Sequence, residues 1–274
     1  MSEAAVGRPT VAGALSDATF ALGAAGCDTP RLDAELLLAS VLGVERGRLV
    51  VDARSELDAS ALARFEALVA RRAAREPVAY ILGRKEFRRI ELFVDRRVLI
   101  PRPETELLVE VGLSLPSGAR VVDIGTGSGA VALALADERP DLSIVGTDVD
   151  PDALAVAREN GARLGLQVSF LEADLLEGLD GRFDAVLANL PYVASGVDLP
   201  PEIARYEPAG ALFSGPDGLD LIRRLLPMVA GLPLVALEVG LAAYVASLAR
   251  EVGFGSVEIL RDLAGHERVV VARH

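Results

Sequence analysis

The sequence has few of the residues that form disulfides and metal sites. It contains one cysteine and two histidines, which excludes an internal disulfide and a multi-cysteine metal site and argues against catalysis by a bound metal. No run approaches the roughly 18 apolar residues of a membrane helix, and Met1-Ser2-Glu3 lacks the basic and apolar segments of a signal peptide. We therefore expect a cytoplasmic protein without a membrane segment.

An overall positive charge is also missing. The formal net charge is −12 at pH 7, and residues 1–95 carry 13 basic and 14 acidic residues, whereas the remainder carries 15 and 26. Binding through many phosphate contacts requires a basic face, so we expect no stable nucleic-acid binding. Residues 64–89 depart from this balance, with eight basic and three acidic residues. This local excess fits a docking surface for a macromolecule or a solvated helix face.

The length of 274 residues suits two domains, and the N-terminal part shows only helical patterns. Its leucines recur at helical spacing up to Gly43, and Asp58 is placed to cap a further helix. We predict an N-terminal helical docking domain over 1–77, a β-hairpin linker over 78–100 and a larger domain over 101–274.

The linker is predicted from two short apolar stretches. Val78–Leu82 and the alternating stretch Glu91–Asp95 are the expected strands of the hairpin. Pro103 then suits the first position of a helix, with acidic residues in its first turn.

Seven apolar runs after position 120 alternate with helical segments. They are Val121–Ile124, Leu142–Thr147, Val168–Leu171, Phe183–Ala188, Pro233–Leu237, Val257–Leu260 and Val269–Ala272. This alternation predicts an α/β fold with a seven-stranded, doubly wound, Rossmann-like sheet. Because its crossovers are right-handed, the ligand crevice is expected at the C-terminal ends of the strands.

A glycine-rich loop follows the first of these strands. Gly125, Gly127 and Gly129 permit a tight turn, and the helix that follows directs N–H groups toward an anionic ligand. Asp148 ends the second strand, 19 residues past the last glycine, where a carboxylate can accept both hydroxyls of a ribose. The same spacing satisfies a dinucleotide-binding pattern, so a nicotinamide enzyme remains an alternative. Asp148 also suits a helix N-cap.

The tetrapeptide Asn189-Leu190-Pro191-Tyr192 directly follows the fourth strand. The Asn189 side-chain oxygen and the Leu190 carbonyl can each accept one N–H. Pro191 restricts the backbone, and Tyr192 can stack on a flat group. The tetrapeptide therefore fits a planar NH2 group of a base or a side-chain amide, although a plain strand end followed by a turn has the same pattern.

The motifs together resemble a known family. Asp123 before the glycines, Asp174 after the third strand and the tetrapeptide resemble the class I S-adenosylmethionine-dependent methyltransferases. From about Asp33 onward the chain is similar to the protein glutamine methyltransferases that modify class 1 peptide chain release factors. The further motifs that carry this similarity are Glu76-Pro77-Val78-Ala79-Tyr80-Ile81-Leu82-Gly83, Ile100-Pro101-Arg102-Pro103-Glu104-Thr105-Glu106, Tyr206-Glu207-Pro208, Asp217-Gly218-Leu219, and Asp262-Leu263-Ala264-Gly265 with Arg268.

The resemblance implies methyl transfer from S-adenosylmethionine to the side-chain amide of the glutamine in a Gly-Gly-Gln motif of a release factor, which leaves S-adenosylhomocysteine. It implies a cofactor site formed by Gly125, Thr126, Gly127, Ser128, Gly129, Asp148, Leu175 and Asn189. It implies a glutamine clamp formed by Asn189, Leu190, Pro191 and Tyr192. It also implies an antiparallel last strand, and we expect a monomer.

Leu190 departs from the family pattern, which usually has a proline at this position. The predicted mechanism tolerates leucine because the acceptor is the backbone carbonyl, although one fixed φ angle is lost. Asn-Leu-Pro-Tyr is also the form found in ribosomal RNA adenine dimethyltransferases, so an N6-adenine methyltransferase acting on RNA or DNA is the alternative. The acidic C-terminal part argues against it. Four polar residues suit either the site or an ordinary structural role: Arg102, Thr105, Glu207 and Glu238.

Overall fold

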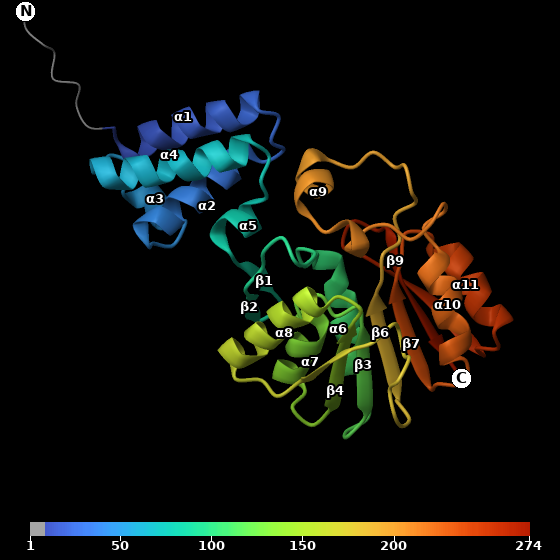
Figure 1. The fold of residues 1–274 in the computed structure, drawn as a ribbon. Coiled ribbons are helices and arrows are strands. Elements are labelled where there is room, and N and C mark those ends of the chain that lie inside the picture. Colours follow the sequence, from blue (N-terminus) through green and yellow to red (C-terminus); the bar gives the residue numbers. More distant parts are fainter. Residues whose placement is uncertain (1–8) are drawn as a thin grey trace, which may run out of the picture. The chain divides into compact units, whose positions relative to one another are not determined.

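The computed structural model describes residues 9–274, which form two compact units (Figure 1). The helical unit runs to Gly83 and also includes Pro201–Tyr206. The sheet unit comprises Arg84–Pro200 and Glu207–His274. Every helix within residues 9–274 is too short or too polar to cross a membrane.

The helical unit is built on three packed helices. Its helices are α1 Val11–Ala24, α2 Pro30–Leu42, α3 Arg48–Val51, α4 Ala59–Ala73, α5 Val78–Leu82 and α9 Pro201–Tyr206. Helices α1, α2 and α4 enclose a core that includes Leu15, Leu37 and Phe65. Gly43 ends α2 in the left-handed conformation with φ 66°, and the Asp58 carboxylate caps α4 by accepting the Ala61 N–H at 2.8 Å. Both predicted helix limits are confirmed.

Buried ion pairs join α2, α4 and α9 within the helical unit. Arg72 is 5% exposed and donates to Asp33 at 2.7 Å and to Glu202 at 2.9 Å. Arg75 also donates to Glu202, at 2.7 Å. Burial raises the pKa of the Glu202 carboxyl, but the hydrogen bonds from Arg75 and Arg72 outweigh burial and hold that pKa well below its usual range. The count of charges along 64–89 therefore overstates the positive charge that this segment presents to solvent.

The segment Val78–Leu82 is helix α5, so the prediction of a strand there is wrong. Gly83 ends this helix in the left-handed conformation with φ 66°. A short apolar run between a proline and a glycine suits a helix or a strand equally, and periodicity alone does not separate the two. The hairpin forms between β1 Lys85–Phe87 and β2 Ile90–Leu92, so the expected second strand Glu91–Asp95 is present only at Glu91 and Leu92.

All seven predicted strands form in the sheet unit. They are β3 Arg120–Ile124, β4 Ser143–Asp148, β5 Ser169–Glu172, β6 Ala185–Asn189, β7 Leu234–Glu238, β8 Ser256–Arg261 and β9 Glu267–Arg273. Their order is β5-β4-β3-β6-β7-β9-β8, and β9 is antiparallel to both of its neighbours, as expected for the last strand. The accompanying helices are η1 Pro103–Thr105, α6 Glu106–Leu113, α7 Ala130–Glu138, α8 Pro151–Leu164, η2 Ala209–Ala211, α10 Asp220–Val229 and α11 Ala242–Glu251.

Helices cover both faces of the sheet, and the alternation of side chains places three polar residues on one face. Ile124, Ala188 and Leu237 pack in the core that includes α10 and α11. Neighbouring residues of a strand project to opposite faces, so Asp123, Asn189 and Glu238 project to the other face. Helix α6 packs on β6 and β7 there, and α7 packs on β3. The C-terminal ends of β3, β6 and β7 thus each carry a polar side chain on the face that α6 and α7 cover.

Candidate active site

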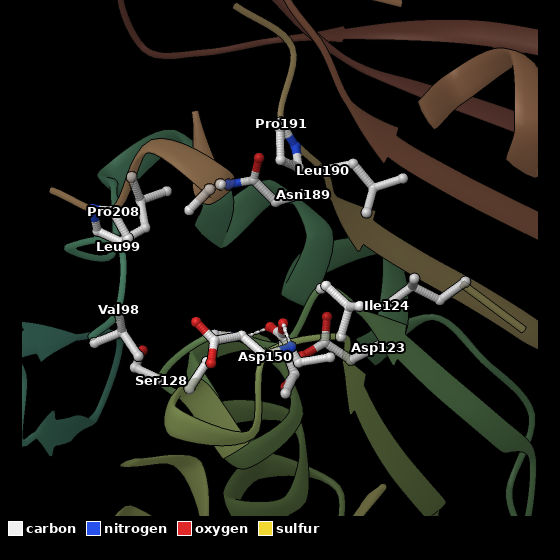
Figure 2. Close-up of a pocket in the computed structure, with 18 of the residues that line it drawn as sticks. Val98, Leu99, Asp123, Ile124, Ser128, Asp150, Asn189, Leu190, Pro191 and Pro208 are labelled. Atoms are coloured by element: carbon white, nitrogen blue, oxygen red, sulfur yellow. Dashed lines mark hydrogen bonds between the residues drawn. The ribbon is translucent and has the colours of Figure 1, made fainter. Parts of the chain in front are cut away.

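A cavity of about 220 Å³ lies at the C-terminal ends of β3, β4 and β6. Nine of the predicted site residues line it: Gly125, Thr126, Gly127, Ser128, Asp148, Leu175, Asn189, Leu190 and Pro191. Figure 2 shows Asn189 and Pro191 on one side of the cavity and Ser128 and Asp150 on the opposite side. Gly129 and Tyr192 do not line the cavity.

The glycine-rich loop is held by hydrogen bonds to Asp123. This buried carboxylate accepts the Thr126 hydroxyl at 2.6 Å and the Ala132 N–H at 3.2 Å. Burial raises the pKa of Asp123 to about 6, against the opposing effect of these two hydrogen bonds. Gly127 has φ 54°, and a Cβ atom there would meet nothing within 4 Å. The loop thus presents bare backbone to the cavity, while Gly129 caps α7 with φ 82°.

Asp148 is half-buried at the end of β4 and lines the cavity. Its two carboxylate oxygens accept the Gly127 N–H at 2.9 Å and the Asp150 N–H at 3.0 Å. Burial raises its pKa. The N-cap of α8 is Asp150, which accepts the Asp152 N–H at 2.9 Å, so the N-cap alternative for Asp148 is wrong. Each oxygen of Asp148 keeps a lone pair for a ligand hydroxyl.

Leu175 adopts a left-handed backbone conformation at the cavity wall. Its φ is 57° and its side chain is 5% exposed. A non-glycine residue in this conformation costs about 1–2 kcal/mol. The Thr147 hydroxyl donates to the Leu175 carbonyl at 3.4 Å. The left-handed turn therefore fixes an apolar wall beside Asp148, and sequence patterns give no signal for it because leucine rarely adopts this conformation.

The side chain of Asn189 is oriented by Thr105. The Asn189 Nδ2 donates to the Thr105 Oγ1 at 3.1 Å, and both residues line the cavity. An amide that donates through Nδ2 to a protein group has its Oδ1 available as an acceptor. The helix start at Pro103 places Thr105 beside the end of β6, so a residue that the sequence left open between a structural and a site role contacts the predicted clamp.

The remaining clamp residues are anchored through the loops that follow β6. The Leu190 side chain is 5% exposed and packs in the sheet core, where it approaches a Cβ position on Gly125 to 3.1 Å. Gly218, with φ 79°, lies against the Tyr192 carbonyl, and a Cβ there would be 2.2 Å from that oxygen. Burial, then the nearby Glu238 carboxylate, raises the pKa of the Tyr192 phenol. The side chain of Leu190 thus points into the core, which leaves its backbone for the cavity.

Two further carboxylates lie near the clamp. Glu207 is buried and accepts the Ile100 N–H at 3.3 Å and a hydrogen bond from Arg102, which partly offsets the effect of burial in raising its pKa. Glu238 is 1% exposed and follows a different pattern, because neither of its oxygens has a hydrogen-bond partner among residues 9–274. Burial raises the pKa of Glu238 to about 7. Glu238 pairs in register with Asn189 across β6 and β7, a relation that the sequence does not reveal.

Family models match both parts of the chain. The model described as "PrmC N-terminal domain" matches residues 13–83. The model described as "Methyltransferase small domain" matches residues 103–204.

Two curated relatives are similar over most of their length. A release factor glutamine methyltransferase of Mycolicibacterium smegmatis is 47% identical over 223 residues, which cover 79% of this chain and 78% of the relative. One of Moorella thermoacetica is 41% identical, with 96% of this chain and 98% of the relative covered.

A solved structure shows the same fold. The crystal structure of the hMettl16 catalytic domain in complex with MAT2A 3′UTR hairpin 6 matches with a TM-score of 0.57 at 17% identity. The match covers 75% of this chain and 81% of that chain. At this identity the likeness bears on the fold alone, and it agrees with the predicted α/β class.

Proposed function

Because this chain belongs to the release factor glutamine methyltransferase family, we propose that it methylates the side-chain amide nitrogen of a release factor glutamine, with S-adenosylmethionine as methyl donor. The substrate residue is the glutamine of the Gly-Gly-Gln motif in class 1 peptide chain release factors, as the sequence resemblance implies. The protein acts as a monomer in the cytoplasm in this proposal, and its helical unit docks the release factor.

The orientation of the Asn189 amide is the observation that carries the proposal. Its Nδ2 donates one hydrogen to Thr105, which leaves its Oδ1 as the atom that can accept from a ligand in the cavity. An acceptor at this position fits a ligand that brings a hydrogen-bond donor, and the N–H of a side-chain amide is such a donor. The Leu190 carbonyl is the proposed acceptor for the second N–H.

The opposite side of the cavity fits S-adenosylmethionine. Gly127 offers backbone with open space in front of it, and Asp148 has lone pairs for the ribose hydroxyls. Leu175 and Val149 supply apolar surface for a base. When bound, S-adenosylmethionine supplies a methyl group on a positively charged sulfur. The nicotinamide alternative for the glycine-rich loop conflicts with membership of a methyltransferase family, and binding of S-adenosylhomocysteine without binding of NAD is the test that separates the two ligands.

The clamp residues act by positioning and by electrostatics. An amide nitrogen is a weak nucleophile because its lone pair is delocalised into the carbonyl. Accepting both of its hydrogens on Asn189 and Leu190 raises the electron density on nitrogen and fixes its rotation. No covalent nucleophile is required. The described residues that line the cavity include no histidine, cysteine or lysine, so we assign no general base among these types.

The test is mass spectrometry of a recombinant class 1 release factor after incubation with this protein and isotope-labelled S-adenosylmethionine. We expect one methyl group on the glutamine of Gly-Gly-Gln, and no label in a matched release factor with alanine at that glutamine. Label at another residue, or none while S-adenosylhomocysteine still binds, contradicts the proposal. RNA or DNA carrying adenine is the substrate to try next, because Asn-Leu-Pro-Tyr also fits that base.

A further inference from the structure

Glu238 is a buried carboxylate with no hydrogen-bond partner in the described part of the chain. It is 1% exposed at the end of β7. Buried polar groups are nearly always hydrogen-bonded, because an unpaired charge in a low-dielectric interior destabilises the fold. A position that carries this cost beside a binding cavity is a candidate for a functional role.

The register of β6 with β7 and the Thr105 hydroxyl connect Glu238 to the clamp. Glu238 and Asn189 are register partners on neighbouring strands and project to the face covered by α6. Thr105 precedes α6, and its hydroxyl accepts the Asn189 amide. The same hydroxyl lies near enough to Glu238 to lower its pKa in part, although neither carboxylate oxygen has hydrogen-bond geometry to it. The Thr105 hydroxyl still has one hydrogen to donate, and Glu238 still needs a donor.

We propose that Glu238 is a positioning residue for methyl transfer, which acts through the Thr105 hydroxyl to hold the Asn189 amide with its oxygen toward the substrate. The role rests on the proposed function. The ionised carboxylate draws the Thr105 hydrogen toward itself, so the hydroxyl presents only lone pairs to Asn189. The Nδ2 group is then the one end of the amide that can bond to Thr105.

The other charged groups around Glu238 do not replace Thr105 in this role. Arg268, Arg102 and Glu104 act on Glu238 only through charge, the two arginines lowering its pKa and Glu104 raising it. Both arginines form ion pairs with other carboxylates: Arg268 pairs with Asp262, and Arg102 pairs with Glu207. Tyr192 is a fourth neighbour, and Glu238 contributes to the raised pKa of its phenol. Of the two neutral hydroxyl groups near the carboxylate, that of Thr105 is the one that also contacts the Asn189 amide.

Protonation of Glu238 removes the constraint. A protonated carboxyl can itself donate to the Thr105 oxygen, and the Thr105 hydrogen becomes free to attract the Asn189 oxygen away from the cavity. The orientation of Asn189 therefore follows the ionisation of Glu238, and clamp strength rises with pH across a range near pH 7. The direction follows because the ionised form is the one that fixes the amide.

The chain offers a direct spectroscopic test, because its side-chain amide groups are only those of Asn160, Gln167 and Asn189. In 15N-labelled protein without cofactor or substrate, we expect the Asn189 amide signals to shift with pH, with a midpoint near pH 7. The Glu238→Gln and Thr105→Val variants are expected to lose this shift, and Thr105→Ser to keep it. Asn160 is the internal control, since its amide donates to the Phe93 and Ser128 carbonyls.

Kinetics provide the second readout. We expect Glu238→Gln and Thr105→Val to lower kcat by about five- to tenfold, the scale of one hydrogen bond, with KM for S-adenosylmethionine unchanged. The rise of kcat through pH 7 disappears in both. Glu258→Gln, the same change at an exposed site on β8, is the matched control and keeps wild-type values.

Two outcomes overturn the proposal. An Asn189 signal that does not titrate, or that titrates equally in Glu238→Gln, removes the link between the two residues. A loss of turnover in Glu238→Gln as large as in Asn189→Ala assigns the carboxylate a direct role on the substrate in place of positioning. The amide spectra need no substrate, so failure of the proposed function in the release factor assay leaves this test intact.

Discussion

Asp123 and Glu238 are buried carboxylates that project to the same face of the sheet, yet their surroundings differ. Asp123 accepts two hydrogen bonds that hold the glycine-rich loop and the start of α7. Glu238 accepts none within residues 9–274. We call the side of the cavity formed by the glycine-rich loop and Asp148, where we propose that the methyl donor binds, the donor side, and the clamp with the neighbouring Thr105 and Glu238 the acceptor side. The donor side is thus completed by bonds inside the protein, whereas Glu238 next to the clamp keeps unsatisfied oxygens. In a site of this kind, the residues that bind the substrate contribute less to the stability of the fold.

The same contrast holds for the residues that face the cavity. Asp148 accepts two backbone N–H groups, which fix it before any ligand arrives. Asn189 donates one hydrogen bond to Thr105, and its oxygen is the acceptor that we propose for the substrate. Changes on the acceptor side should therefore affect turnover, and changes on the donor side should affect cofactor binding.

The largest expected effect is that of Asn189→Ala. Loss of one acceptor should lower turnover by about 10²-fold or more, by analogy with removal of one oxyanion-hole donor. Binding of S-adenosylhomocysteine, measured by calorimetry, should stay within about threefold of wild type, a bound set by less than one hydrogen bond. A variant that turns over at a near-normal rate refutes the clamp.

Asp148→Asn should produce the opposite pattern. The amide keeps one acceptor oxygen but loses the charge, so affinity for S-adenosylhomocysteine should fall by about 10- to 100-fold, the scale of hydrogen bonds to a charged group. The kcat at saturating cofactor should change much less. A fall in kcat with unchanged affinity would show that Asp148 acts in the methyl-transfer step and not in cofactor binding.

Glu238→Gln should stabilise the protein in a pH-dependent way. The pKa of Glu238 is about 7, above its usual value, so the folded state holds the proton more tightly and wild-type stability falls as pH rises toward and through 7. Glutamine does not titrate, so the gain of the variant over wild type should be about 2 kcal/mol larger at pH 8.5 than at pH 5.5, because about 1.5 pH units separate pH 5.5 from the pKa of Glu238.

Thermal unfolding at the two pH values measures this gain, with Glu258→Gln as the control for removing an exposed carboxylate. A Glu238→Gln variant that is less stable at both pH values would show that the carboxylate has partners that stabilise the fold. It would then resemble Asp123, and the contrast between the two sides would not hold.

Leu190→Pro should have the smallest effect. Proline restores one fixed φ angle, worth about 0.4–1 kcal/mol, but it removes part of a buried side chain that packs in the sheet core. We expect turnover within about threefold of wild type and a lower Tm, because the proposed acceptor is a backbone carbonyl that both residues provide. A tenfold change in turnover would show that the side chain at this position shapes the clamp.

The sequence predicted much of the sheet unit because its signals are local. Apolar runs bounded by turns identify strands such as β3 and β6, and glycines after β3 mark the loop. The run Val78–Leu82 was misassigned because five apolar residues fit either period. The charge count overestimated the positive charge that residues 64–89 present to solvent, because Arg72 and Arg75 pair with Glu202, which lies far along the chain.

The acceptor side could be predicted only in part. Asn189 could be singled out as a candidate because the tetrapeptide is contiguous, and it lines the cavity. The link between Asn189, Thr105 and Glu238 depends on the register of β6 with β7 and on where α6 begins, and neither is written in a local pattern. When residues meet only through tertiary packing, their joint chemistry can be inferred only after the fold is known.

A crystal structure with S-adenosylhomocysteine and a Gly-Gly-Gln peptide would show whether Asn189 presents its oxygen to the substrate amide. We expect the glutamine side-chain nitrogen at about 3 Å from both the Asn189 Oδ1 and the Leu190 carbonyl oxygen, with the Asn189 Nδ2 still on Thr105. A glutamine bound elsewhere, or an Asn189 amide turned so that its Nδ2 faces the peptide, would contradict it.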